Sequence, residues 1–386
     1  MDQRTNPILF SFLRSAICGT KLTDEERAKY SPLQLSDLLK TAQKHDVEHL
    51  LILGLKQNAL IAKEHAEIEK RMLKAVYRYE KFHRESVQLF LALEDAEIPF
   101  LPLKGSVLRQ YYPEAWLRTS CDIDILVHRE NLEKAISYLK ENLEYVEKKR
   151  AMHDVSLFSP SGVPVELHFD LVEEGRANRA PDVLKDVWQN VFLHKKSRYQ
   201  YEMSDPFFYF YHIAHMAKHF ENGGCGIRPF IDLYILDHLE NGNLDERNKV
   251  LSAGGLLSFA NASRQLAKVW FGGEAADALS LQMQDFILHG GVYGSHDNRV
   301  ALQQKKKGGR IGYLLSRVFV PYAKLKRHYP ILEKHRYLTP LMQVRRWFML
   351  LSPDIAKMAR RELAVNRRID PCKAEEMNAF LKQIGL

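Results

Sequence analysis

A change of hydrophobic period divides this chain into three parts. Between Pro7 and about Glu94 the apolar residues recur three and four positions apart, which is the spacing of amphipathic helices. From Ile98 to Leu171 they form short runs and alternations that are typical of β-strands, and after Asp205 the helical spacing returns. The pattern predicts an α+β protein in which a mixed sheet is inserted between two helical regions. The predicted divisions are 1–94, 95–204 and 205–386.

The strands and turns of the central part can be placed individually. Residues 98–103 form an apolar run bounded by prolines and followed by Lys-Gly-Ser and an amphipathic stretch, which predicts strand, tight turn and helix. Residues 121–127 alternate before they become wholly aliphatic, so we expect a second strand, and 131–142 has helical spacing. Runs at 155–158 and 163–171 are separated by Ser-Pro-Ser-Gly, whose turn chemistry predicts a β-hairpin.

Three acidic residues in these strands are candidate metal ligands. Asp122 and Asp124 are two residues apart in a strand, so their side chains share one face, about 7 Å apart along the backbone. Because adjacent carboxylates repel each other, a divalent cation with oxygen ligands commonly neutralises them. Glu166 shares one face of a later strand with His168 and Asp170, and if that strand is adjacent it can supply a third carboxylate. The alternative is solvated acids at a sheet edge and on the outer face of the hairpin.

The tripeptide Lys104-Gly105-Ser106 has the composition of a phosphate-binding turn. Glycine lets the backbone approach a phosphate, a helix N-terminus offers N–H donors, and serine adds a hydroxyl. The segment lacks the complete G-x-x-x-x-G-K-[ST] pattern, so the sequence does not predict a P-loop. Lys104 and Arg118 are candidate cations for phosphate, and either could equally be a surface cation paired with a nearby acid.

Histidines near these motifs raise the question of a separate metal site. His215 and His219 are one helical turn apart and share a face. A zincin-type site needs glutamate after the first histidine, whereas Met216 and Ala217 follow His215. We therefore expect these two histidines to line the site or to pack beneath it. His168 is expected either to line the site or to fill the face of the hairpin.

Positive charge is concentrated near the C-terminus. The chain has a net charge of +8, yet residues 305–368 carry 17 Lys or Arg against three acidic residues, which makes this segment about +14. Such a segment faces nucleic acid, lipid head groups or a phosphorylated substrate, or it is a solvated surface without a specific partner. No recognisable RNA-binding motif or DNA-reading helix accompanies these cations, which makes nucleic acid the least favoured partner.

Cysteine usage and the N-terminus indicate the compartment. The four cysteines lie far apart without a CxxC pair, so neither a disulfide framework nor a zinc knuckle is predicted. The N-terminus lacks the basic segment and cleavage pattern of a signal peptide, and no run of 18 apolar residues occurs. We expect a cytoplasmic protein, with peripheral contact at the inner membrane face through residues 305–368 as an open alternative.

Taken together, the motifs resemble a known family. The segments that carry the resemblance are 100–108 (FLPLKGSVL), Tyr112-Pro113, Arg118, 121–127 (CDIDILV) and 165–169 (VELHF). They are similar to those of the uncharacterised bacterial nucleotidyltransferase family of the polymerase-beta superfamily, whose members often accompany polysaccharide biosynthesis genes. The match is specific over about residues 98–172. Softer similarity is carried by 215–219, 228–232, 319–321 and 328–330.

The resemblance implies two-metal transfer of a nucleoside monophosphate from an NTP to a hydroxyl acceptor, in polysaccharide or surface-glycan biosynthesis. It implies that Asp122 and Asp124 bridge two Mg²⁺ ions, with Mn²⁺ as an alternative, and that Glu166 holds the ion that activates the acceptor. Ser106 and the amides after Gly105 would hold the β- and γ-phosphates. Two alternatives stay open: a non-catalytic nucleotidyltransferase-like scaffold, and a nucleotidyltransferase that modifies nucleic acid.

Overall fold

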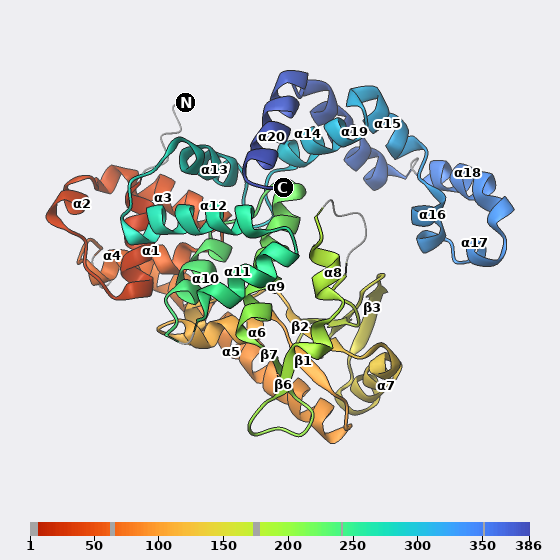
Figure 1. Cartoon of the computed structure of the whole chain (residues 1–386), viewed down its shortest axis with the longest axis horizontal. Helices are drawn as coiled ribbons and strands as arrows, with labels where there is room; N and C mark the ends of the chain where they lie inside the picture. The colour runs from red at the N-terminus through yellow and green to blue at the C-terminus, as the bar shows by residue number, and fades with distance from the viewer. Residues whose placement is uncertain (1–6, 62–65, 173–177, 241, 350–351) are drawn as a thin grey trace. The chain divides into compact units, whose positions relative to one another are not determined.

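A computed structural model describes residues 7–61, 66–172, 178–240, 242–349 and 352–386 of the chain. The chain divides into two compact units (Figure 1). The first unit comprises 1–218, 226–292 and 385–386, and the second comprises 219–225 and 293–384. The helical part that begins at residue 205 therefore contributes to both units. The three-part division by hydrophobic period stays a prediction.

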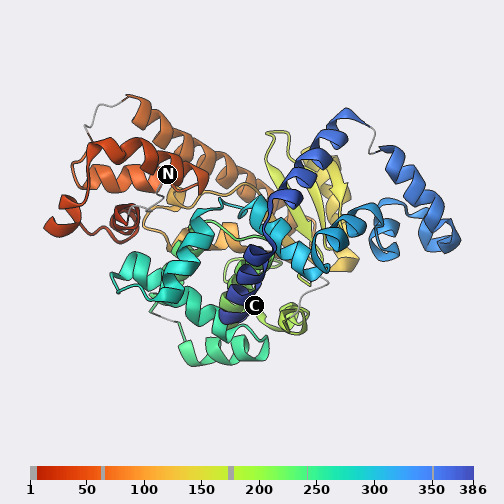
Figure 2. The same cartoon turned by 90° about the horizontal axis from the view of Figure 1, so that it is seen from above.

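The segment before the sheet is helical, as its apolar spacing predicts. Its helices are α1 (Ile8–Cys18), α2 (Asp24–Ala28), α3 (Leu35–Lys44), α4 (Glu48–Gln57) and α5 (Ala66–Asp95). Thr23 caps α2, because its hydroxyl accepts a hydrogen bond from the Glu26 N–H (3.2 Å) and its N–H donates to the Glu26 carboxylate (3.0 Å). Helices α1 and α4 pack tightly (Figures 1 and 2), and a Cβ on Gly54 would lie only 2.1 Å from the Phe12 carbonyl oxygen.

A five-stranded mixed sheet belongs to the first unit. Its elements are β1 (Phe100–Pro102), β2 (Ile123–Val127), α7 (Leu132–Leu143), β3 (Val146–Arg150), β4 (Asp154–Phe158) and β5 (Pro164–His168). The strand order is β1-β2-β5-β4-β3, in which β2 and β5 are parallel and the other neighbours antiparallel. The predicted β4–β5 hairpin is confirmed, and its turn contains Gly162 at φ +78°, a conformation that favours glycine.

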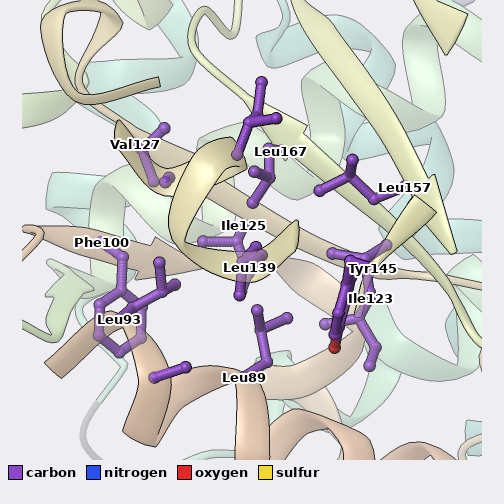
Figure 3. Packing of buried hydrophobic residues seen from close by; sticks show 14 of the residues in the cluster. Leu89, Leu93, Phe100, Ile123, Ile125, Val127, Leu139, Tyr145, Leu157 and Leu167 are labelled. Atoms are coloured by element: carbon purple, nitrogen blue, oxygen red, sulfur yellow. The ribbon is translucent and has the colours of Figure 1, made fainter. Parts of the chain in front are cut away.

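The hydrophobic core of the sheet lies on the face that α5 and α7 cover. Figure 3 shows Leu89 of α5 and Leu139 of α7 packed against Ile123 and Ile125 of β2, and all four side chains are completely buried. Side chains alternate between the two faces of a strand. Because the isoleucines of β2 point toward the helices, Asp124 between them points to the opposite face.

Helices resume after the sheet, so the predicted α+β architecture is confirmed. The elements that complete the first unit are α6 (Lys104–Leu108), α8 (Ala180–Leu184), β6 (Val191–Leu193), β7 (Tyr201–Met203), α9 (Asp205–Glu221), α10 (Arg228–Asp237), α11 (Leu244–Ala253), α12 (Leu257–Ala267) and α13 (Ala278–Leu288), with the last residues of α9 assigned to the second unit. Strands β6 and β7 form a separate antiparallel pair. The predicted helices near 207–220 and 229–239 correspond to α9 and α10.

The second unit is helical apart from its connections. Its helices are α14 (His296–Lys306), α15 (Gly309–Val318), α16 (Tyr322–His328), α17 (Ile331–Lys334), α18 (Thr339–Met349), α19 (Pro353–Arg368) and α20 (Pro371–Gln383). Leu325, Leu332 and Met342 form a small buried cluster between α16, α17 and α18. Within the described ranges, no helix combines the length and the apolar character that crossing a bilayer would require.

Candidate active site

Two of the predicted carboxylates lie directly opposite each other in the sheet. The parallel register of β2 and β5 places Asp124 beside Glu166, and His168 follows on the same face of β5. The Nε2 atom of His168 lies 3.4 Å from Oδ1 of Asp124 and 3.6 Å from Oε2 of Glu166. One ligand atom from each of these three residues lies within 4.8 Å of the others, a spacing that would suit a single metal ion.

Asp122 lies at the margin of this group. It immediately precedes β2, and its carboxylate does not share a three-residue ligand group with Asp124 and Glu166 among the described residues. Burial and then the charge of Asp124 raise the pKa of Asp122, so the two carboxylates are close enough to repel each other. The structure thus brings Asp124 and Glu166 together with His168. From the sequence, His168 was expected either to line the site or only to fill the face of the hairpin.

The ionisation of the group reflects crowded negative charge. Burial and the charge of Asp124 raise the pKa of Glu166 to about 7. Burial alone would raise the pKa of Asp124, but the hydrogen bond and the charge of His168 outweigh it and lower that pKa. Burial opposes protonation of His168, yet its hydrogen bond to Asp124 and the nearby carboxylates raise its pKa. The neighbouring carboxylates thus favour the protonated form of His168.

A second group of possible ligands adjoins the first. Asp154 of β4 pairs with His168 in the antiparallel register, and His153 precedes it. Ligand atoms of these three residues also lie within 4.8 Å of one another, so His168 belongs to both groups. The sequence analysis missed His153 and Asp154. The signal was available in the hairpin, because its register brings the first residue of one strand beside the last residue of the other.

The predicted phosphate-binding turn is joined to β2 by its backbone. The Leu103 N–H donates to the Asp124 carbonyl oxygen at 2.9 Å, and helix α6 begins at the next residue. Lys104, Gly105 and Ser106 therefore form the first turn of a helix that starts earlier than predicted, because Leu103 is the last extended residue. The Ser106 N–H donates to the Leu103 carbonyl oxygen at 3.1 Å, so this amide already has a partner.

Two side-chain positions in this turn have unusual surroundings. The Ser106 hydroxyl is buried and has no hydrogen-bond partner in the described part of the chain. A Cβ on Gly105 would lie 2.9 Å from the Ser120 Oγ, so the absence of a side chain allows the turn to approach the loop that leads to Asp122. A side chain at residue 105 would therefore require the Ser120 hydroxyl to move.

Lys104 is the cation of the turn that faces the carboxylates. Burial lowers the pKa of Lys104 to about 7; the charge of Asp124 opposes this shift, and those of Arg118 and Lys218 add to it. Its Nζ atom lies 5.5 Å from the centroid of the Tyr211 ring. Because the charges of Asp124 and Asp122 act on Lys104, and its pKa is about 7, an added anion such as phosphate would favour its charged form.

Arg118 is neither a surface cation nor an isolated one. Its Nε and Nη2 atoms donate to the two carboxylate oxygens of Asp232 at 3.1 and 2.9 Å, and both side chains are buried. The Tyr112 hydroxyl donates to the same carboxylate at 2.7 Å. Arg118 therefore carries a bidentate ion pair inside the protein, which fixes its position and leaves its charge near the site.

The loop of residues 118–121, which leads to Asp122, is held by further arginines. Arg228 of α10 donates to the Thr119 carbonyl oxygen at 3.0 Å and to Asp46 at 2.8 Å. Arg78 of α5 donates to the Ser120 carbonyl oxygen at 2.7 Å and to the other oxygen of Asp46 at 3.2 Å. The sequence analysis missed this network, although Arg228 lies in a segment that contributed to the resemblance.

The remaining predicted site residues lie outside these groups. His215 is half-buried in the part of α9 that belongs to the first unit. His219 is half-buried and belongs to the second unit. Neither histidine is a member of the metal-ligand groups that the described residues form. Their predicted role as lining of the site stays a prediction.

Comparison with known protein families identifies the family of this chain. A family described as "Uncharacterised nucleotidyltransferase" matches residues 31–272, which include the turn, all three predicted carboxylates and the Arg118–Asp232 pair. Comparisons with curated proteins and with solved structures give no match. Because the matched region covers more than half of the 386 residues, the chain belongs to this family of uncharacterised nucleotidyltransferases.

Proposed function

We propose that this protein transfers a nucleoside monophosphate from an NTP to a hydroxyl acceptor with the help of divalent cations, and that its family belongs to the polymerase-beta superfamily. The observation that carries the proposal is the parallel register that places Asp124 beside Glu166, with His168 in contact with both. Paired carboxylates on neighbouring strands, next to a cationic turn, are suited to bind a cation together with a phosphate group.

The acidic residues fit a divalent cation by their own chemistry. Glu166 has a pKa of about 7 because burial and the neighbouring Asp124 disfavour its charge, and the same causes raise the pKa of Asp122. Carboxylate oxygens of this kind suit Mg²⁺ and Mn²⁺. Asp122, Asp124 and Glu166 would hold two such ions. The ions would supply positive charge to the oxygens of the phosphoryl group during transfer.

Other residues would bind and orient the nucleotide. Ser106 has a hydroxyl without a partner in the described structure, and this hydroxyl would donate to a phosphate oxygen. Lys104, with a pKa of about 7, would gain its proton fully beside that phosphate. Arg118 would contribute charge from its fixed position on Asp232, and His168 would orient the Asp124 carboxylate.

We further propose a glycan precursor or other small hydroxyl compound as the acceptor and the cytoplasm as the compartment. The four cysteines are free thiols, which supports a reducing environment. The two alternative functions make different predictions. A scaffold would bind nucleotide without turnover, and an enzyme acting on nucleic acid would bind RNA or DNA with strong salt dependence.

The decisive experiment uses the full chain and titrates each NTP with Mg²⁺ or Mn²⁺ by calorimetry, followed by measurement of pyrophosphate release with candidate hydroxyl acceptors. We expect at least one NTP to bind in a metal-dependent manner. Asp124→Asn and Glu166→Gln should lower turnover by about three orders of magnitude, because each removes a charged ligand worth several kcal/mol in the transition state. The melting temperature should change little.

Asp170→Asn is the matched control. Asp170 follows β5 on the same alternation as Glu166 and His168, but its carboxylate pairs with Arg129 at 3.5 Å and is not part of the ligand groups. Its variant should keep nucleotide binding and turnover. Metal-independent NTP binding that survives both site substitutions would favour the scaffold. Filter binding to RNA and DNA at low and high salt tests the third function.

A further inference from the structure

Helix α15 of the second unit carries an exposed apolar stripe. Ile311, Leu315 and Val318 recur at spacings of four and three, and their exposed fractions are 74%, 52% and 41%. The opposite side of the helix packs inward through Tyr313, which is almost completely buried. One face of the helix therefore packs against the interior of the second unit. The other apolar face is not covered by any part of the described structure.

Helix α18 repeats this arrangement. Leu341, Val344 and Phe348 recur at spacings of three and four and are between 40% and 68% exposed. Met342 of the same helix points inward and belongs to the small core of the unit. Single exposed apolar residues are common on protein surfaces, but two stripes at regular helical spacing indicate surfaces that bind something.

The two stripes are connected. The Phe319 ring, directly after α15, meets the Trp347 ring of α18 edge to face at a centroid distance of 5.6 Å. The Trp347 indole N–H also donates to the Val318 carbonyl oxygen at 2.9 Å. The end of α15 is thus attached to α18, and Figure 1 shows both helices within the second unit. An aromatic pair of this kind, half apolar and half polar, suits a membrane interface.

The second unit also contains lysines without an ion-pair or hydrogen-bond partner among the described residues. The side chains of several lysines in or next to α14, α16 and α17 make no ion pair or hydrogen bond with any residue that the structure describes; they are Lys306, Lys307, Lys324, Lys326 and Lys334. Some other cations of the unit are paired, as Lys305 is with Glu375 and Arg317 with Glu362. Lys306, Lys307, Lys324 and Lys334 are exposed and Lys326 is half-buried, so these lysines supply positive charge at the surface of the unit.

We propose that the second unit docks on the surface of an anionic phospholipid bilayer. The apolar stripes would enter the boundary between head groups and acyl chains, and the unpaired lysines would meet the anionic head groups. Nucleic acid would use the cations but leave exposed Ile311 and Leu315 without a partner. A lipid surface satisfies both features, and this inference is independent of the proposed nucleotidyl transfer.

The test sediments the full chain with vesicles of phosphatidylcholine alone and of phosphatidylcholine mixed with phosphatidylglycerol. We expect strong binding to the mixed vesicles, weak binding to the neutral ones, and partial release by salt. Leu315→Ser and Phe348→Ser should each weaken binding to the mixed vesicles about tenfold, because each removes apolar surface that would be buried in the bilayer. Lys324→Gln and Lys326→Gln should each weaken it about fivefold.

Leu73→Ser and Leu91→Ser are the matched controls, because both leucines are exposed on α5 of the first unit. These variants should bind vesicles as the parent chain does. Circular dichroism checks the folding of every variant, and the lysine variants keep the proposal testable if a stripe variant unfolds. Absent binding, equal binding to both vesicle types, or tighter binding to RNA would overturn the proposal. So would a dimer that the stripe variants convert to a monomer, since a second copy would then cover the stripes.

Discussion

In the first unit the arginines Arg118, Arg228 and Arg78 near the site have carboxylate partners, whereas several lysines of the second unit have none among the described residues. Arg118 is held by Asp232 at two points, and Arg228 and Arg78 share Asp46. A buried charge must be paired because its desolvation is costly, and pairing fixes its position. An exposed lysine keeps its freedom. The first arrangement suits a small ligand of defined geometry, and the second suits a broad surface of variable shape.

The largest expected effect tests the difference between buried and exposed pairs. Asp232→Ala removes the partner of the buried Arg118 guanidinium and of the Tyr112 hydroxyl, and should lower the free energy of unfolding by about 3–5 kcal/mol. Asp297→Ala breaks the exposed pair with Arg368 and should cost about 0–1 kcal/mol. Urea denaturation measures both variants. Equal losses would show that burial does not distinguish the two units.

A smaller effect concerns the crowded carboxylates of the first unit. Glu166 has a pKa of about 7, so below that pH a metal ion must displace its proton. Mn²⁺ affinity should therefore fall about tenfold per pH unit below pH 7 and level off above it. Calorimetry between about pH 6 and pH 8 measures the slope. Glu166→Gln should bind Mn²⁺ more weakly, and its Mn²⁺ affinity should no longer depend on pH through residue 166. If the pH dependence of the affinity is unchanged in this variant, another group is responsible for it.

The smallest effect sharpens the role of one hydroxyl. Ser106→Ala should leave stability nearly unchanged, because the hydroxyl has no partner in the described structure, but should raise the KM for NTP about threefold to tenfold. Ser263 of α12 is the matched control, since its hydroxyl is also buried without a described partner. Ser263→Ala should leave KM unchanged. An unchanged KM for NTP in both variants would show that Ser106 does not contact the nucleotide.

The sequence predicted the strands of the site because side-chain alternation and turn residues depend only on neighbouring positions in the chain. Alternation around Asp124 placed the carboxylate opposite the core, and Gly162 marked the hairpin that brings Glu166 into the sheet. The exposed strand β3 was not predicted, because VEKKR has almost no apolar residues to show a period. The start of α6 at Lys104 depends on the extended conformation of Leu103, which no residue type requires.

Long-range partners were beyond the reach of the sequence. Asp232 lies 114 residues after Arg118, and Asp46 lies 73 residues before Thr119. No pattern along the chain connects residues at such separations, and a single buried aspartate looks like any other in a helix. Alternation within the strands, and then the resemblance, predicted the carboxylates as candidate site residues. Neither showed that His168 would contact both Asp124 and Glu166, because that depends on the register of two strands.

The network that holds residues 118–121 limits how the family could have recombined its parts. A segment cut out at residues 95–204 would retain the sheet, the turn and every predicted carboxylate. It would lose Asp46 and Arg78 on one side and Arg228 and Asp232 on the other. Arg118 would then lose its ion-pair partner Asp232 at its buried position. We therefore expect that insertions and gene fusions are tolerated outside the span from Asp46 to Asp232, and that the sheet with its candidate site would not fold correctly when moved alone into another protein.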